Sequence, residues 1–204
     1  MINPYFKTPP VVQNLIIANC VIYLAMALIP AVNLFCSEYL QLFWVGAPYF
    51  RSYQFVTYMF LHGGFAHLFS NMFALWMFGR TLEYELGSRR FLIYYMVCGI
   101  GAALFQMGVA WLTGDIYFRV VGASGAVMGL LLAFGVMHPN NMIYIIPLPF
   151  PIKAKWFVMG YAILEIVLGW SGVNTGVAHF AHVGGMVWGL LLLFLWRKQR
   201  KIFF

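Results

Sequence analysis

Long apolar stretches separated by short polar segments run through the whole chain. A membrane-spanning helix needs about 20 mostly apolar residues. Six stretches approach this length: 11–32, 65–82, 91–112, 121–137, 156–173 and 176–196. Residues 39–61 are also apolar, but Pro48 and Arg51 interrupt them, and prolines forbid a straight helix across 142–152. The pattern therefore predicts an all-α membrane protein, a bundle of six transmembrane helices in one domain over residues 1–204.

Basic residues between these stretches predict how the helices are oriented. Lys and Arg near the ends of spans mark the cytoplasmic side of a membrane. With the N-terminus inside, the inner segments hold ten of the 12 basic residues, and the outer segments hold only Arg51 and Arg119. We therefore expect a multi-pass protein of the cell (inner) membrane with both termini in the cytoplasm. The outer connection at 33–64 is rich in aromatic residues, which predicts an ordered loop embedded at the outer membrane surface.

Composition indicates that the lipid bilayer surrounds this chain. Hydrophobic residues make up 63% of it and charged residues only 8%, whereas a soluble domain carries about 25% charged residues. The net charge of +7 comes from scattered residues, so it predicts membrane orientation and no nucleic-acid partner. The three cysteines show neither a disulfide framework nor metal-ligand spacing. Ala25–Ala27 resembles a signal-peptidase site, but its apolar stretch is too long for a typical signal peptide, so we expect the span to be retained.

Few polar side chains fall inside the predicted spans, and each is therefore a candidate for function. His67 and Asn71 lie early in the second span, Ser124 early in the fourth, and His179 and His182 early in the sixth. These three spans run in the same direction across the membrane. All five side chains are therefore expected in the outer half of the membrane, at similar depth.

Small residues on two of these spans predict where helices meet. The pairs Gly125/Gly129 and Gly185/Gly189 each form a small-xxx-small pattern, which lets helix backbones approach closely. If the two glycine faces meet, the serine of the fourth span and the second histidine of the sixth come within hydrogen-bond reach.

Such a pair has a recognisable chemistry. A serine hydroxyl is a poor nucleophile until a base takes its proton, and neutral histidine is suited to that task near pH 7. Ser124 is therefore the candidate nucleophile and His182 the candidate base. The unpaired N–H groups at the start of the fourth span, with His67 and the Asn71 amide, could hold the oxyanion of a tetrahedral intermediate.

Each of these features also has a simpler structural explanation. Glycine patches in membrane helices often serve packing alone, and the Ser124 hydroxyl could bond a carbonyl one turn back. Glu165 in the fifth span could line a cavity, pair with a neighbour or be protonated, and we assign it no catalytic role. A serine, two histidines and an asparagine at one depth on alternate spans favour chemistry over packing.

Other membrane chemistries lack the residues they need. The sequence has no HExxH motif for a zinc protease, and its single aspartate, Asp115, lies in a loop, which excludes an aspartyl dyad within the membrane. His179 and His182 could ligate a metal or haem, but this leaves Ser124 and its glycines unexplained. We therefore predict no metal and no cofactor. A transporter or channel, and a catalytically silent protein that binds transmembrane helices, are the alternative functions.

Four motifs resemble those of the rhomboid intramembrane serine proteases. They are HGGFAHLFSN (62–71), GRTLEYELG (79–87), GASGAVMG (122–129) and AHVGGMVWG (181–189). Their order and spacing match this family from the first span to the sixth, in its basic six-span bacterial form. One departure is that Tyr53-Gln54 stands where a Trp-Arg pair is common in the outer loop.

The resemblance implies a Ser–His dyad without an acidic third member. Ser124 would be the nucleophile and His182 the general base. His67, Asn71 and the Ser124 backbone N–H would support the oxyanion. The implied reaction is an acyl transfer through an acyl-enzyme, which needs no cofactor.

The family also implies structural roles and a substrate class. Glu83 would anchor the outer loop and the span ends, and Gly185 would let the sixth span approach the fourth. Gly122, Gly125 and Gly189 are expected to shape the same contact. The implied function is an endopeptidase that cleaves single-span or membrane-anchored proteins in or near their membrane helix. Its active site would open to the outer face, with the fifth span and the loop after it as a gate.

Overall fold

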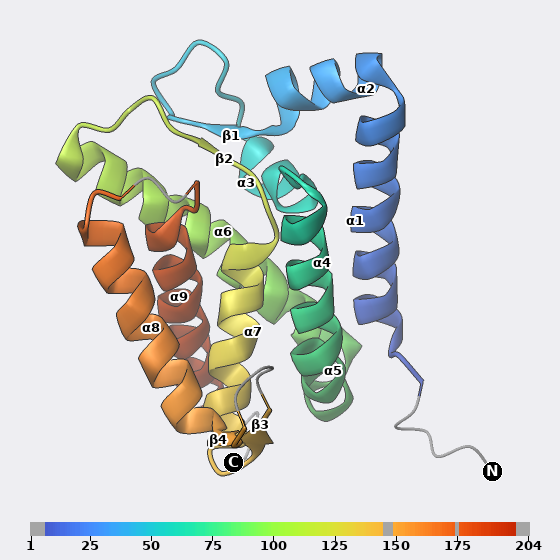
Figure 1. Cartoon of the computed structure of the whole chain (residues 1–204), viewed down its shortest axis with the longest axis vertical. Coiled ribbons are helices and arrows are strands. Elements are labelled where there is room, and N and C mark those ends of the chain that lie inside the picture. The colour runs from blue at the N-terminus through green and yellow to red at the C-terminus, as the bar shows by residue number, and fades with distance from the viewer. Residues whose placement is uncertain (1–6, 145–148, 174–175, 199–204) are drawn as a thin grey trace.

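The computed structural model describes residues 7–144, 149–173 and 176–198 (Figure 1). In this part of the chain the long helices run side by side, and a loop structure covers one end of them (Figure 1). Both chain ends, which we expect in the cytoplasm, lie outside the described residues, as does Pro147. The described chain is mainly helical, which confirms the all-α prediction.

The long helices follow the predicted apolar stretches. Their bounds are α1 Pro10–Leu28, α6 Ser88–Thr113, α7 Ser124–Met137, α8 Ala154–Trp170 and α9 His179–Lys198. The predicted stretch 65–82 is one continuous helix made of α4 (Phe65–Ala74), the π-helical turn η4 (Leu75–Gly79) and α5 (Arg80–Leu86).

The surface of these helices is that of an integral membrane protein. Within the described residues, α1, α6 and α9 are long and apolar enough to cross a membrane, and α7 is a shorter apolar helix of 14 residues. Large apolar side chains stand exposed on the outward faces, for example Leu28, Leu112 and Trp170. Exposed apolar area of this extent requires an apolar surrounding such as lipid. The six-span count stays a prediction.

The first apolar stretch is broken where the sequence pattern predicts one helix. α1 ends at Leu28, Ile29 is extended (φ −122°, ψ 102°), and the short helix α2 begins at Pro30 and ends at Phe35. The cause is Pro30, because proline disfavours the helical conformation in the residue before it while fitting well at the start of a new helix. The predicted bound at residue 32 is therefore wrong by about one turn.

At the centre of the bundle, α7, α9 and α6 pack so closely that their glycine positions leave no room for a side chain. A methyl group on Gly185 would overlap the carbonyl oxygen of Gly125, so α7 and α9 touch through their backbones. Gly129 and Gly189 instead make room for α6: a methyl on Gly129 would overlap the Cys98 thiol, and one on Gly189 the Tyr94 hydroxyl. The glycine pattern thus brings together three helices, where the sequence suggested two.

The outer connection between α1 and α4 is built from short elements. After α2 come the π-helical turn η2 (Cys36–Leu40), strand β1 (Leu42–Phe43), helix α3 (Gln54–Thr57) and the 3-10 turn η3 (Tyr58–Phe60). The buried Gln54 amide donates hydrogen bonds to the carbonyls of Tyr39 and Tyr49, at 3.0 and 2.9 Å. Gln54 therefore holds the connection together from a position where the Trp-Arg pair was expected.

Two antiparallel strand pairs lie at the helix ends. β1 pairs with β2 (Arg119–Val120), with Leu42 opposite Val120. β3 (Met142–Ile143) pairs with β4 (Ile152–Lys153) in the connection from α7 to α8. The first pair matters for the site, because it fixes the segment that leads directly into α7.

Glu83 ties helix starts together at the opposite end of the bundle from the 33–64 connection (Figure 1). Its carboxylate accepts the backbone N–H groups of Val11 and Val12 at 3.0 and 2.8 Å, and the Ser88 hydroxyl at 2.6 Å. These contacts join the beginnings of α1 and α6 to α5. The span-end part of the expectation agrees with these contacts. The outer-loop part does not, because α5 and that loop lie at opposite ends of the bundle (Figure 1).

Candidate active site

Ser124 stands at the first residue of α7 because of the glycine two residues before it. Gly122 has φ 125°, a conformation that side chains rarely adopt. Its N–H donates to the Tyr58 carbonyl at 2.9 Å, which ties the turn to η3. The chain comes out of β2, turns sharply at Gly122 and starts the helix. The first N–H groups of α7 therefore have no partner within their own helix, and they lie beside the Ser124 hydroxyl.

Gly122 also marks the point where two predicted site residues converge. A Cβ atom there would lie 2.7 Å from Cε1 and Nε2 of the His67 ring and 3.6 Å from the Ser124 hydroxyl oxygen. The His67 ring and the Ser124 hydroxyl therefore flank the same small space from α4 and α7. Any side chain at Gly122 would fill it.

The backbone of α4 and the turn before it orient His67. The Gly63 N–H points at His67 Nδ1 with a long separation of 3.4 Å. When Nδ1 accepts this bond, the ring proton is on Nε2, which with Cε1 forms the edge of the ring that faces Gly122. Asn71 is buried one turn later and donates one amide hydrogen to the His67 carbonyl at 2.9 Å, so its second amide hydrogen is the one available to a substrate.

His182 lies in the first turn of α9, buried against α8. Its Nδ1 is 3.0 Å from Glu165 Oε1, and Glu165 Oε2 is 2.6 Å from His179 Nδ1. The His179 contact is a hydrogen bond, whereas the His182 contact has ion-pair distance without hydrogen-bond direction. The sequence left three roles open for Glu165: lining a cavity, pairing with a neighbour or being protonated. The structure shows that it pairs with neighbours.

The two dyad candidates lie on facing helices. Gly125 directly follows Ser124, Gly185 lies three residues after His182, and the two glycines are in backbone contact. Within the described residues the Ser124 hydroxyl makes no hydrogen bond. The hydrogen bond between a catalytic nucleophile and its base is often long until substrate binds.

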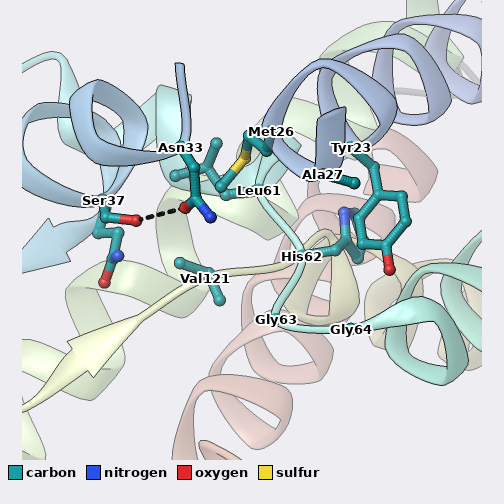
Figure 2. A pocket seen from close by; sticks show the side chains of 11 residues that line it. Tyr23, Met26, Ala27, Asn33, Ser37, Leu61, His62, Gly63, Gly64 and Val121 are labelled. Atoms are coloured by element: carbon teal, nitrogen blue, oxygen red, sulfur yellow. Dashed lines mark hydrogen bonds between the residues drawn. The ribbon is translucent and has the colours of Figure 1, made fainter. Parts of the chain in front are cut away.

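A cavity of about 440 Å³ adjoins this site on the side of α1 and α2 (Figure 2). It is lined by Tyr23, Met26, Ala27, Asn33, Ser37, Gln41, Leu61, His62, Gly63, Gly64 and Val121. Asn33 and Ser37 are joined by a hydrogen bond of 3.1 Å at one side of it (Figure 2). The cavity reaches the site through the turn before α4 and through Val121, the residue before Gly122. None of the lining residues belongs to α8.

His62 connects the cavity to the site, and sequence reasoning did not select it. Its ring centroid lies 5.0 Å from that of His67, and within the described residues neither ring nitrogen has a partner. Burial, with a further contribution from His67, lowers the pKa of His62 to about 4. The ring is therefore neutral at pH 7. The HGGFAH motif contains this histidine, so its position five residues before His67 is a signal that could have identified it.

Comparisons with known proteins identify the family of this chain. Residues 49–199 match the model of the rhomboid domain. The chain is 33% identical over 167 residues to Rhomboid-like protein 11, chloroplastic, of Arabidopsis thaliana, a match that covers 72% of this chain and 53% of that protein. It is 31% identical over 147 residues to the rhomboid protease AarA of Providencia stuartii, covering 66% of this chain and 52% of that protein.

A third relative aligns with almost all of this chain. The rhomboid protease GlpG of Salmonella choleraesuis is 24% identical over 195 residues, which is 93% of this chain and 64% of that protein. The chain thus spans about half to two thirds of the length of these relatives. The rhomboid domain match covers most of the described bundle, including every residue that converges at Gly122. The chain belongs to the rhomboid family.

Proposed function

We propose that this chain is an intramembrane serine endopeptidase that cleaves single-span or membrane-anchored proteins in or beside their membrane helix. The observation that carries the proposal is the convergence of the Ser124 hydroxyl and the His67 ring at Gly122, with His182 on the helix that touches α7. Relatives named as rhomboid proteases, such as AarA, support the same activity.

Acylation would begin at the Ser124 hydroxyl. His182 Nε2 takes the hydroxyl proton as the oxygen attacks the carbonyl carbon of the scissile bond. The negative charge moves to the carbonyl oxygen, where the Ser124 N–H, the His67 Nε2–H and the Asn71 amide can donate to it. The intermediate collapses, the C–N bond breaks, and the leaving amine receives the proton from His182.

Deacylation repeats these steps with water as the nucleophile. His182 takes a proton from water, and the resulting hydroxide attacks the acyl carbon. The ester bond breaks, Ser124 recovers its proton from His182, and the new carboxylic acid leaves. The substrate helix must unwind locally to expose its peptide bond, so small or helix-breaking residues are expected near the cleavage site.

The charge pattern supports a topology for this enzyme. Six spans would place both termini in the cytoplasm of an inner-membrane protein, and the starts of α4, α7 and α9 near the outer face. The short α7, about 21 Å long against a hydrocarbon core of about 30 Å, lets Ser124 lie below the outer surface. Water would reach it through the outer opening.

Cleavage by the purified protein tests the proposal. The full chain in detergent is incubated with a panel of single-span substrates, beside Ser124→Ala and His182→Ala. We expect wild type to cut at least one substrate and both variants to leave it whole. If every substrate that wild type cuts is also cut by Ser124→Ala, or if wild type cuts none, the proposal is contradicted. A transporter or a silent helix-binding protein would give that result.

A further inference from the structure

A buried carboxylate on α8 lies between two histidines of α9. Glu165 is 3% exposed, and each of its oxygens faces a different ring: Oε2 faces His179 Nδ1 and Oε1 faces His182 Nδ1. A buried charged or polar group is costly unless it is paired. Oε2 is hydrogen-bonded to His179 Nδ1, and Oε1 lies at ion-pair distance, 3.0 Å, from His182 Nδ1, a nitrogen atom that can carry a proton.

From this contact we infer that Glu165 is a positioning residue that orients His182 for proton transfer. The inference rests on the proposed function and adds an acidic member to the Ser–His pair. The carboxylate would hold His182 with a proton on Nδ1, which leaves the lone pair of Nε2 for the Ser124 hydroxyl. Glu165 would itself touch neither substrate nor the reacting atoms.

The chemistry of imidazole supports this role. A neutral imidazole carries one N–H, and the acceptor beside one nitrogen decides which nitrogen keeps the proton. A carboxylate accepts only, so the nitrogen that faces it is the protonated one. When His182 takes the Ser124 proton, the imidazolium that forms faces a buried negative charge 3.0 Å away, which stabilises it.

His179 makes the carboxylate a fixed support. Its Nδ1 is hydrogen-bonded to Oε2 at 2.6 Å, so the carboxylate is held in one rotation while Oε1 faces His182. His179 and His182 are three residues apart on α9 and therefore lie on the same helix face. One carboxylate from α8 can reach both rings for this reason, and the cluster also ties α8 to α9.

The same three residues could be taken for a metal site, since their ligand atoms lie within 4.8 Å of one another. The contacts argue against it. Two ligands of a tetrahedral zinc ion, each about 2.0–2.1 Å from the metal, are separated by about 3.3 Å. The 2.6 Å separation between Glu165 and His179 is shorter than that and has the length of a charge-assisted hydrogen bond.

Glu165→Gln tests the inference, because glutamine keeps the shape of the side chain and removes its charge. In the full chain in detergent, we expect kcat to fall by at least about 10-fold while KM stays within about twofold of wild type. Labelling of Ser124 by a fluorophosphonate should slow in the same proportion. A residue that only joins α8 to α9 would affect KM and stability instead.

Glu85→Gln is the matched control. Glu85 forms another Glu–His pair, with 3.0 Å between its Oε2 and His138 Nε2, but this pair is partly exposed and lies at the end of α7 opposite Ser124. Its loss should leave kcat and the labelling rate unchanged. Glu165→Gln with wild-type kcat, or with a raised KM alone, overturns the inference and leaves the proposed protease intact. If wild type shows no cleavage that is lost in Ser124→Ala, the proposed function fails and the inference fails with it.

Two measurements on the wild-type chain cover the case in which Glu165→Gln does not fold. Nitrogen NMR of histidine-labelled protein, assigned with His182→Ala, should show His182 protonated on Nδ1 and unprotonated on Nε2 at neutral pH. The opposite tautomer overturns the inference. Dialysis against EDTA should leave cleavage unchanged, and a loss that Zn²⁺ restores would make the cluster a metal site and overturn it as well.

Discussion

Gly185 of α9 lies so close to Gly125 of α7 that a methyl group on Gly185 would overlap the Gly125 carbonyl oxygen. Gly125 is the residue after Ser124, and Gly185 lies three residues after His182. The separation of the two helix backbones at this point therefore sets the separation of the proposed nucleophile and base.

Gly185→Ala should consequently abolish most of the cleavage activity. The added methyl has to push α9 away from α7, and a displacement of about 1 Å between reacting groups costs on the order of 100-fold in rate. Substrate cleavage by the purified variant measures this. Gly160→Ala on α8 is the control, since a Cβ there meets no atom within 4 Å, and it should retain wild-type activity. If Gly185→Ala and Gly160→Ala were equally active, the backbone contact between α7 and α9 would not determine the geometry of the site.

His67 and Asn71 are predicted to act on the oxyanion, so their loss should lower kcat more than it raises KM. We expect His67→Ala and Asn71→Ala each to lower kcat by about 10²–10³-fold, the usual effect of removing one oxyanion donor. Ser70→Ala is a matched control on the same helix. The exposed Ser70 hydroxyl also donates to the His67 carbonyl, at 3.1 Å, without reaching the site. Steady-state kinetics measure these effects. If Ser70→Ala lowers kcat as much as Asn71→Ala does, the oxyanion role of Asn71 is contradicted.

Glu83 is expected to matter for stability and little for chemistry. Glu83→Ala leaves the N–H groups of Val11 and Val12 without their acceptor, and each unsatisfied donor costs about 1–3 kcal/mol. The midpoint of thermal unfolding in detergent should fall clearly. Glu85→Ala removes a carboxylate from the same helix, but one in an exposed pair, so the midpoint should barely move. The reverse order of the two midpoints would contradict the anchoring role of Glu83.

The topology can be checked with single cysteines placed at Arg51 and Lys153 in a chain whose own three cysteines have been replaced. An impermeant thiol reagent added to intact cells should label the residue at 51 and not the one at 153. Both positions carry a basic residue in wild type, so each cysteine replaces a similar side chain. Labelling of both positions, or of neither, from outside would contradict the six-span topology.

The bundle could be predicted from the sequence because lipid imposes a simple rule on it. A run of apolar residues long enough to cross a membrane has to form a helix that satisfies its own backbone hydrogen bonds. Pro30 also predicts the break before it, because proline restricts the backbone of Ile29. The apolar pattern alone does not contain this restriction. The bounds of the first helix were therefore less certain than its existence.

The candidate site was predictable only in part. Ser124, His182, His67 and Asn71 stood out because polar groups in apolar spans are rare. The pairing of Glu165 with the two α9 histidines could not be read from spacing, because it depends on how α8 is rotated against α9. That rotation is decided by packing between helices. The position of the cavity beside α1 likewise depends on the fold of the outer connection, whose register no periodic pattern sets.

Reaction of the wild-type chain with a fluorophosphonate, followed by mass spectrometry of the labelled peptide, tests the central claim most directly. The reagent forms a covalent bond with a serine oxygen only where a base activates it. We predict a single adduct on Ser124 in wild type and none at that position in His182→Ala. An unlabelled wild-type chain, or a Ser124 adduct that forms equally fast in His182→Ala, would contradict the account of Ser124 and His182 as nucleophile and base.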